Sequence, residues 1–279
     1  MAEVGRPIIH NLGDQDFPAY INLLLYGYSG IGKTPLWGTG GSELLLMDSD
    51  NGVESAIAAN AKCDVVSAHG FGEVAEVADF LRYSDDAKKK YRWVAWDGIS
   101  LFMDRVLVDE ILPDAHAQNP KQSKDVASQR EYLIVQNRVS DLVRRFVSLP
   151  MNFGMSAIVM SAENPEGETI YVPLIPGKRG EFSSKISGYM NVVSYYGRTP
   201  GGTRRMLTSQ TGHYFARDRF GAIKSRVKDS KSGQLKVRPW LDNPTLPKIE
   251  ELIERKRKQH GQDQADSQEG SRRSGSRRR

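Results

Sequence analysis

The sequence LLLYGYSGIGKTPLWG, residues 23–38, decides the fold that we expect for this chain. An apolar run leads into a glycine-rich segment, which is followed by a lysine and a threonine. Residues 27–34 match the pattern G-x-x-x-x-G-K-[ST], with an apparent buried strand before it and a helical stretch after it. A chance glycine turn is the alternative, but motif, strand and helix agree. The stretch therefore predicts a loop that wraps around a phosphate group.

Each residue type in this loop suits a bound nucleotide. Gly27, Gly30 and Gly32 let the backbone curl so that successive N–H groups point at a phosphate. Lys33 supplies a positive charge for the β- and γ-phosphates, and Thr34 offers a hydroxyl to Mg²⁺. We predict ATP and Mg²⁺ as ligands. The predicted nucleotide-binding residues are Gly27, Tyr28, Ser29, Gly30, Ile31, Gly32, Lys33, Thr34 and Pro35, the last of which suits the first turn of a helix.

Acidic residues at the ends of other strands are candidates for the metal site and for the attacking water. Asp97 ends the apolar run 92–97, where a carboxylate can hold Mg²⁺; capping of the next helix is the alternative. Gly98 follows, so a glutamate directly after that aspartate is absent. Asp48 and Asp50 follow another apolar run and should share the same sheet edge. We predict Thr34 and Asp97 as metal ligands and Asp50 as the catalytic carboxylate; helix capping or turn formation is the alternative role for Asp48 and Asp50.

Alternating strand and helix patterns predict an α/β fold with a mainly parallel sheet flanked by helices. Expected strands lie at 21–26, 43–48, 92–97 and 156–161, and expected helices at 72–83 and 129–149. After Glu163, a segment rich in Gly, Pro and basic residues predicts a hairpin or long loop. Short strands are expected at 190–197, 204–209 and 212–216, and a last helix at 247–258.

Charge is distributed unevenly along the 279 residues, whose formal net charge is +5. Residues 255–279 hold nine Lys and Arg against three Asp and Glu, so residues 1–254 are nearly neutral. We predict one domain over 1–254 and a disordered basic tail over 255–279. Because the sequence has a single cysteine and no apolar run of membrane-spanning length, we expect a soluble, cytoplasmic protein without membrane contact.

The order of YGYSGIGKT, LLLMDSDNG, WVAWDGIS, SAIVMSAEN, PLIPGK and FARDRFG resembles that of phage-encoded RecA-core ATPases. These are described as phage nucleotide-binding proteins or single-strand-annealing recombinase ATPases. The resemblance covers roughly residues 20–225 and implies a RecA-like P-loop NTPase core that hydrolyses ATP with Mg²⁺. It also implies host-cell cytoplasm as the location. By position, Asp50 resembles the catalytic carboxylate, and Lys33 and Asp97 complete the expected catalytic set. Glu163, with Ser161 and Ala162, falls where a polar sensor contacts the γ-phosphate, although the family often has a histidine at Ala162.

The same resemblance implies partners. Loops 113–126 and 164–185 fall where RecA-type proteins approach single-stranded DNA; solvated surface loops are the alternative. Arg217 or Arg219 could reach the nucleotide of a neighbouring subunit in a homo-oligomer, or form a surface ion pair. The basic tail could add nucleic-acid affinity or merely solubility. Other phage replication or recombination proteins are further possible partners.

Two other functions remain open from the sequence. A P-loop kinase for a nucleotide or small metabolite would need an arginine-rich lid, for which residues 197–205 are a weak candidate. A nucleotide-dependent interaction module would bind ATP and hydrolyse it poorly, which the departures at Ala162 and Asn191 favour slightly.

Overall fold

The computed structural model describes residues 20–164, 166–177, 180–228 and 235–259. Most of the predicted basic tail, residues 260–279, lies outside the described residues. Within the described parts of the chain, no helix is both long and apolar enough to span a bilayer.

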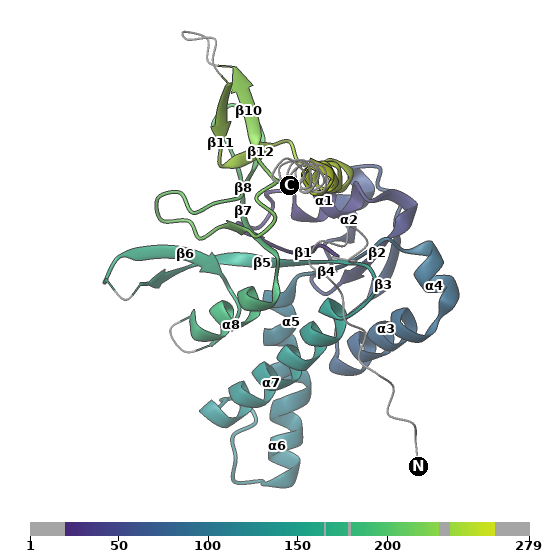
Figure 1. The fold of residues 1–279 in the computed structure, drawn as a ribbon. Helices are drawn as coiled ribbons and strands as arrows, with labels where there is room; N and C mark the ends of the chain where they lie inside the picture. Colours follow the sequence, from purple (N-terminus) through teal and green to yellow (C-terminus); the bar gives the residue numbers. More distant parts are fainter. Residues whose placement is uncertain (1–19, 165, 178–179, 229–234, 260–279) are drawn as a thin grey trace, which may run out of the picture.

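A mostly parallel sheet forms the centre of the molecule, as predicted (Figure 1). Its strands lie in the order β12-β8-β7-β1-β5-β4-β2-β3. The parallel strands are β1 (Asn22–Gly27), β2 (Leu44–Asp48), β3 (Asp64–Ser67), β4 (Trp93–Asp97), β5 (Asn152–Glu163) and β7 (Val192–Arg198). Antiparallel strands extend it: β6 (Thr169–Pro173), β8 (Arg204–Leu207), β9 (Arg217–Asp218) and β12 (Trp240–Asp242). A separate hairpin consists of β10 (Ser225–Lys228) and β11 (Leu235–Arg238).

Helices cover both faces of the sheet (Figure 1). The α-helices are α1 (Lys33–Gly38), α2 (Val53–Ala58), α3 (Phe71–Tyr83), α4 (Asp85–Lys90), α5 (Ile99–Val106), α6 (Leu112–Gln118), α7 (Gln129–Val147), α8 (Glu181–Tyr189) and a C-terminal helix at 246–259. A 3-10 helix (Gly41–Glu43) precedes β2, and a π-helical turn (Leu107–Ile111) joins α5 to α6.

Successive residues of each central strand enter two different cores. In β1, Leu23 and Leu25 pack with α1 and the C-terminal helix, whereas Leu24 and Tyr26 pack with α3, α5, α7 and α8. A strand buried on both faces needs an uninterrupted apolar run, which is why these strands could be recognised in the sequence. Both cores therefore hold the end of β1, and with it the glycine loop, in a fixed place.

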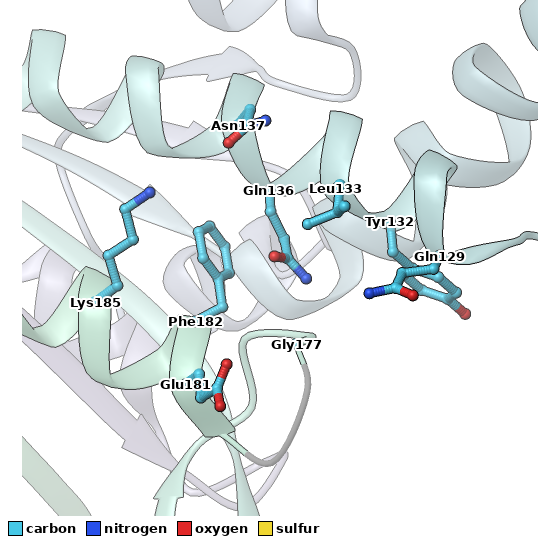
Figure 2. A pocket seen from close by; sticks show the side chains of 9 residues that line it. All are labelled: Gln129, Tyr132, Leu133, Gln136, Asn137, Gly177, Glu181, Phe182 and Lys185. Carbon is cyan, nitrogen blue, oxygen red and sulfur yellow. The ribbon is translucent and has the colours of Figure 1, made fainter.

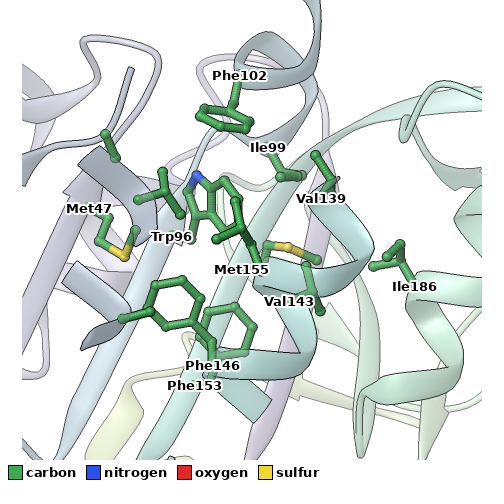
Figure 3. Packing of buried hydrophobic residues seen from close by; sticks show 14 of the residues in the cluster. Met47, Trp96, Ile99, Phe102, Val139, Val143, Phe146, Phe153, Met155 and Ile186 are labelled. Atoms are coloured by element: carbon green, nitrogen blue, oxygen red, sulfur yellow. The ribbon is translucent and has the colours of Figure 1, made fainter. Parts of the chain in front are cut away.

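Aromatic residues fill the larger core (Figure 3). The Trp96 ring meets the Phe102 ring edge-on at a centroid distance of 4.8 Å, and Phe146 stacks on Phe153 at 5.2 Å. The indole N–H of Trp96 donates to Ser49 Oγ, so its polar atom is satisfied. Because Trp96 is the residue before Asp97 in β4, this packing anchors the strand that carries the carboxylate.

Several boundaries differ from the predictions. The expected strand at 212–216 is wrong: this segment forms only isolated bridges, and β9 follows it. The hairpin expected after Glu163 is confirmed by β5 and β6, but helix α8 follows it. Helix α6 occupies the first part of the loop expected at 113–126. The C-terminal helix continues to residue 259, so residues 255–259 of the expected tail are helical.

Candidate functional site

The glycine loop joins β1 to α1, and its glycines are required for different reasons. Gly30 and Gly32 have φ values of 73° and 102°, which side chains other than glycine rarely adopt. Gly27 lies against β7, where an added Cβ would lie 2.2 Å from the carbonyl oxygen of Tyr196. The loop conformation and its close approach to β7 thus both exclude larger residues.

Lys33 is the first residue of α1, and its side chain folds back onto the start of the loop. Its ammonium group donates hydrogen bonds to the carbonyl oxygens of Gly27 (3.1 Å) and Tyr28 (3.0 Å). Burial lowers the pKa of Lys33, and the carboxylates of Asp97 and Asp50 oppose that change. The lysine charge is therefore held at the loop by the two carbonyls.

A pocket of about 640 Å³ lies in front of the loop. The structure brings several predicted site residues to its wall: Ser29, Gly30, Gly32, Lys33, Thr34, Pro35, Asp50 and Asp97. Gly27, Tyr28 and Ile31 belong to the loop but do not line this pocket. The pocket therefore combines the N–H groups and the cation of the loop with two carboxylates from other strand ends.

Asp97 ends β4 and is completely buried. The Ser156 hydroxyl, on the neighbouring strand β5, donates to Asp97 Oδ1, and the N–H of Gly98 donates to Ser156 Oγ at 3.1 Å. Burial raises the pKa of Asp97, and the hydroxyls of Ser156 and Thr34 oppose this rise.

The other oxygen of this carboxylate indicates a cation site. Asp97 Oδ2 is buried and has no hydrogen-bond partner among the described residues. An unpartnered buried carboxylate oxygen near a threonine hydroxyl suits a hard divalent cation, which prefers oxygen ligands. The residues present therefore fit Mg²⁺, with Thr34 and Asp97 as the side chains that would hold it.

Asp50 occupies the space beside Gly98. A Cβ added to Gly98 would lie 2.8 Å from Asp50 Cβ, and Gly98 has a φ of 93°. A glutamate at residue 98 would therefore collide with Asp50. The carboxylate beside Asp97 is instead that of Asp50, which follows the end of strand β2. The N–H of Gly52 donates to both Asp48 Oδ1 (3.0 Å) and Asp50 Oδ1 (3.1 Å), which fixes the turn.

The environment of Asp50 makes it a stronger base than an ordinary aspartate. Burial, and after it the negative charges of Asp97 and Asp48, together raise the pKa of Asp50 to about 6, although the hydrogen bond from the Gly52 N–H opposes this rise. A carboxylate with a pKa close to neutral pH can accept a proton in a reaction and release it afterwards.

We expect Asp50→Asn to stabilise the protein at pH 8 when Mg²⁺ and nucleotide are absent. In the folded protein the pKa of the Asp50 carboxyl is raised from 3.8 to about 6. The protonated carboxyl therefore contributes fully to stability below about pH 4, and this contribution is lost as the pH rises through 6. Removing the charge should add about 1 kcal/mol to the free energy of unfolding at pH 8, since solvent screens a half-buried group. Urea unfolding in EDTA at pH 8 and pH 5 checks this: the gain should be smaller at pH 5, and a gain independent of pH would contradict the assignment.

The structure does not bring Glu163 to this pocket. Ile158 of β5 pairs with Gly27, and the strand then continues beyond the sheet edge to Glu163, which is exposed and pairs with Thr169 in the β5–β6 hairpin. Ser161 and Ala162 lie in the same hairpin. The polar residue of β5 that contacts the site is Ser156, which is hard to recognise because it lies within an otherwise apolar strand.

The arginines of ARDRFG have local partners in this subunit. The Arg217 guanidinium donates to the carbonyl oxygens of Ser187 (2.6 Å) and Met190 (3.1 Å), and Arg219 donates to that of Gly188 (3.0 Å). Both side chains therefore cap the C-terminal end of α8, where cations are favourable.

Arg204 is a site residue that the sequence indicated only weakly, as part of the stretch 197–205. That stretch forms the β7–β8 hairpin, and Arg204 lines the pocket from β8. A Cβ added to Gly32 would lie 2.8 Å from Arg204 Cζ, so the guanidinium sits directly against the loop. The backbone of Arg204 is fixed by Asn243, whose N–H donates to its carbonyl oxygen at 2.7 Å.

We expect Arg204→Ala to raise the KM for ATP about tenfold or more, because a charged hydrogen bond to phosphate contributes roughly 1.5–3 kcal/mol. Arg204→Lys should restore part of the loss. Arg198→Ala, an exposed arginine of the same hairpin, is the matched control and should leave the KM unchanged. Equal effects of the two alanine variants would show that Arg204 has no special role.

Comparison with known proteins agrees with this geometry. A family profile described as an AAA domain matches residues 19–220, which include the loop, both carboxylate-bearing strand ends and Arg204. No curated protein matched the chain. Because the matched region spans well over half of the sequence, the chain belongs to the AAA domain family, a family of nucleotide-binding P-loop ATPases.

Proposed function

We propose that this protein hydrolyses ATP with Mg²⁺. The observation that carries the proposal is the convergence of Lys33, Thr34, Asp50 and Asp97 on one pocket in front of the glycine loop. The loop, Lys33 and Arg204 suffice for binding of the phosphates. Hydrolysis also requires a group that positions water, and Asp50 supplies one with a pKa of about 6.

Each side chain has a separate role in this scheme. The loop N–H groups and Lys33 bind the β- and γ-phosphates, and Arg204 approaches them from β8. Thr34 and Asp97 would hold Mg²⁺, which neutralises phosphate charge when bound. Asp50 orients a water molecule and accepts its proton, and Ser156 holds the Asp97 carboxylate in position.

We further propose that hydrolysis is linked to single-stranded DNA, in annealing or recombination encoded by a phage. The support is the order of sequence segments described above. The two loops assigned to DNA on that basis flank helix α7: one precedes it, and the other contacts it where Gln136 Nε2 donates to the Pro176 carbonyl oxygen at 3.2 Å. Assembly into a homo-oligomer and action beside other phage proteins belong to the same proposal.

A pocket of about 670 Å³ lies between α7 and α8 (Figure 2), and residues from the second of these segments, between 177 and 185, form one side of it. Tyr132, Leu133 and Gln136 line it from α7, and Phe182 and Lys185 line it from α8. Figure 2 shows the two sets of side chains facing each other across it. Its aromatic and amide groups suit contact with bases, whereas it offers little net charge for phosphates.

The test is ATP turnover by the full chain with and without an oligothymidylate, in parallel with small-molecule phosphate acceptors. Stimulation of phosphate release by the oligonucleotide would support the proposal. Phosphate transfer to an acceptor would identify a kinase, and ATP binding without turnover under either condition would identify an interaction module.

A further inference from the structure

A second charged surface lies far along the chain from the nucleotide loop. It is a groove of about 400 Å³ between the β10–β11 hairpin and the C-terminal helix, and we name it the C-terminal groove. The hairpin projects from the body of the molecule at the top of Figure 1. The groove is lined chiefly by Lys224, Val237, Leu252, Arg255, Lys256 and Gln259.

Two acids of the C-terminal helix face away from the groove. Ile249 and Ile253 are buried in the core beneath it. Glu250 and Glu254 turn toward Arg92, with which they form ion pairs of 2.7 and 2.9 Å. These acids are thus engaged away from the groove and do not neutralise it.

The groove side of the helix carries cations. Leu252, Arg255, Lys256 and Gln259 are spaced at i, i+3, i+4 and i+7, which places them on one helical face. Lys224 reaches the same groove from the segment before β10. Among the described residues, no carboxylate lines the groove and no ion pair involves Lys224, Arg255 or Lys256.

A purely structural role explains only part of this arrangement. Cations in the last turn of a helix interact favourably with its carbonyl end, and this accounts for Arg255 and Lys256. It does not account for Lys224, which comes from another element and adds to the mutual repulsion. A bound polyanion would remove that repulsion.

The sequence concentrates positive charge in this region. Residues 221–259 hold eleven Lys and Arg against five Asp and Glu. The loops at 113–126 and 164–185 are neutral. The first holds two basic and two acidic residues, and the second holds three of each. The groove itself presents three cations of this region, Lys224, Arg255 and Lys256, so it matches a backbone carrying one negative charge per nucleotide better than either neutral loop does.

We infer that the C-terminal groove binds the phosphate backbone of single-stranded DNA. Val237, which is 58 % exposed, and Leu252 provide an apolar surface beside the cations, as suits the sugars and bases of an unpaired strand. This inference rests on the proposed association with single-stranded DNA, but not on ATP hydrolysis. The contacts would be independent of sequence, because the groove cations recognise phosphate rather than base edges.

The test replaces the three cations together, as Lys224→Gln, Arg255→Gln and Lys256→Gln, in the full chain. Binding of a fluorescent oligothymidylate is measured by anisotropy over a range of KCl concentrations. At about 50 mM salt the variant should bind at least about tenfold more weakly, and the slope of log K against log [KCl] should shrink by about 2, since each lost phosphate contact to a single strand removes about 0.7.

The matched control removes the same charge elsewhere, as Lys88→Gln, Lys89→Gln and Arg144→Gln on α4 and α7. Its slope should equal that of the wild type, because none of these three residues lines the C-terminal groove. The exposed ion pairs of Lys88 and Arg144 contribute little to stability, so the fold should be unchanged. Both variants should keep the wild-type melting temperature and basal ATP turnover.

The outcomes separate this inference from the proposed function. Equal slopes for wild type and groove variant would overturn the groove as the DNA site while leaving the association with DNA in place. If the wild-type protein bound anionic vesicles but not the oligonucleotide, both the groove inference and the proposed association with DNA would be overturned. Neither outcome would bear on the proposed ATP hydrolysis, which is measured separately.

Discussion

Lys33→Ala is expected to abolish ATP turnover and to weaken ATP binding by roughly 10²-fold or more, the scale of losing charged hydrogen bonds to two phosphates. The ammonium group lies at the loop, held by the carbonyl oxygens of Gly27 and Tyr28. No other lysine lines this pocket, so no other ammonium group among the described residues can replace it. Titration with a fluorescent ATP analogue and a phosphate-release assay measure the two effects.

The fold should survive this substitution. Burial lowers the pKa of Lys33, which shows that the folded state disfavours the charge rather than depending on it. The melting temperature of Lys33→Ala should therefore equal or exceed that of the wild type, and Lys62→Ala, at an exposed lysine, should change neither activity nor melting. Normal turnover by a folded Lys33→Ala variant would remove the basis of the nucleotide site.

Asp50→Asn is expected to keep ATP affinity within a few-fold and to lower turnover by at least about 10²-fold, the usual scale for losing a general base. Asparagine retains the size of the side chain and can still accept the hydrogen bond from Gly52. It cannot take a proton from water. Single-turnover kinetics at saturating ATP measure the chemical step separately from binding.

Two further variants locate the base. Asp48→Asn should lower turnover less, because Asp48 does not line the pocket. Glu163→Gln should have little effect, because Glu163 lies in the β5–β6 hairpin. Wild-type turnover by Asp50→Asn, together with an inactive Asp48→Asn or Glu163→Gln, would move the catalytic role to that other residue.

The sequence was sufficient for features that depend on local pattern. Strands β1, β2 and β4 are buried on both faces and therefore read as unbroken apolar runs. Helix α7 combines helical periodicity with a capping box formed by Ser128 and Glu131. The glycine loop follows from the spacing of its motif between an apolar run and a helical stretch.

Features that depend on contacts between distant residues were not predictable. The collision that excludes a side chain at Gly98 arises from Asp50, which the fold brings there from another strand. Arg204 reaches the loop only because β8 pairs with β7, which is itself the neighbour of β1. Helix α8 follows a Gly- and Pro-rich segment and is anchored by Phe182 and Ile186 in the core, a contact that local propensity does not reveal.

Phosphate release from ATP by the wild-type full chain, with Mg²⁺ and with EDTA, tests the central claim most directly. The arrangement of Lys33, Asp50 and Asp97 predicts release that is linear in protein concentration, lost in EDTA and lost in Asp50→Asn. Tight ATP binding by the same preparation without any phosphate release, with or without an oligothymidylate, would contradict it.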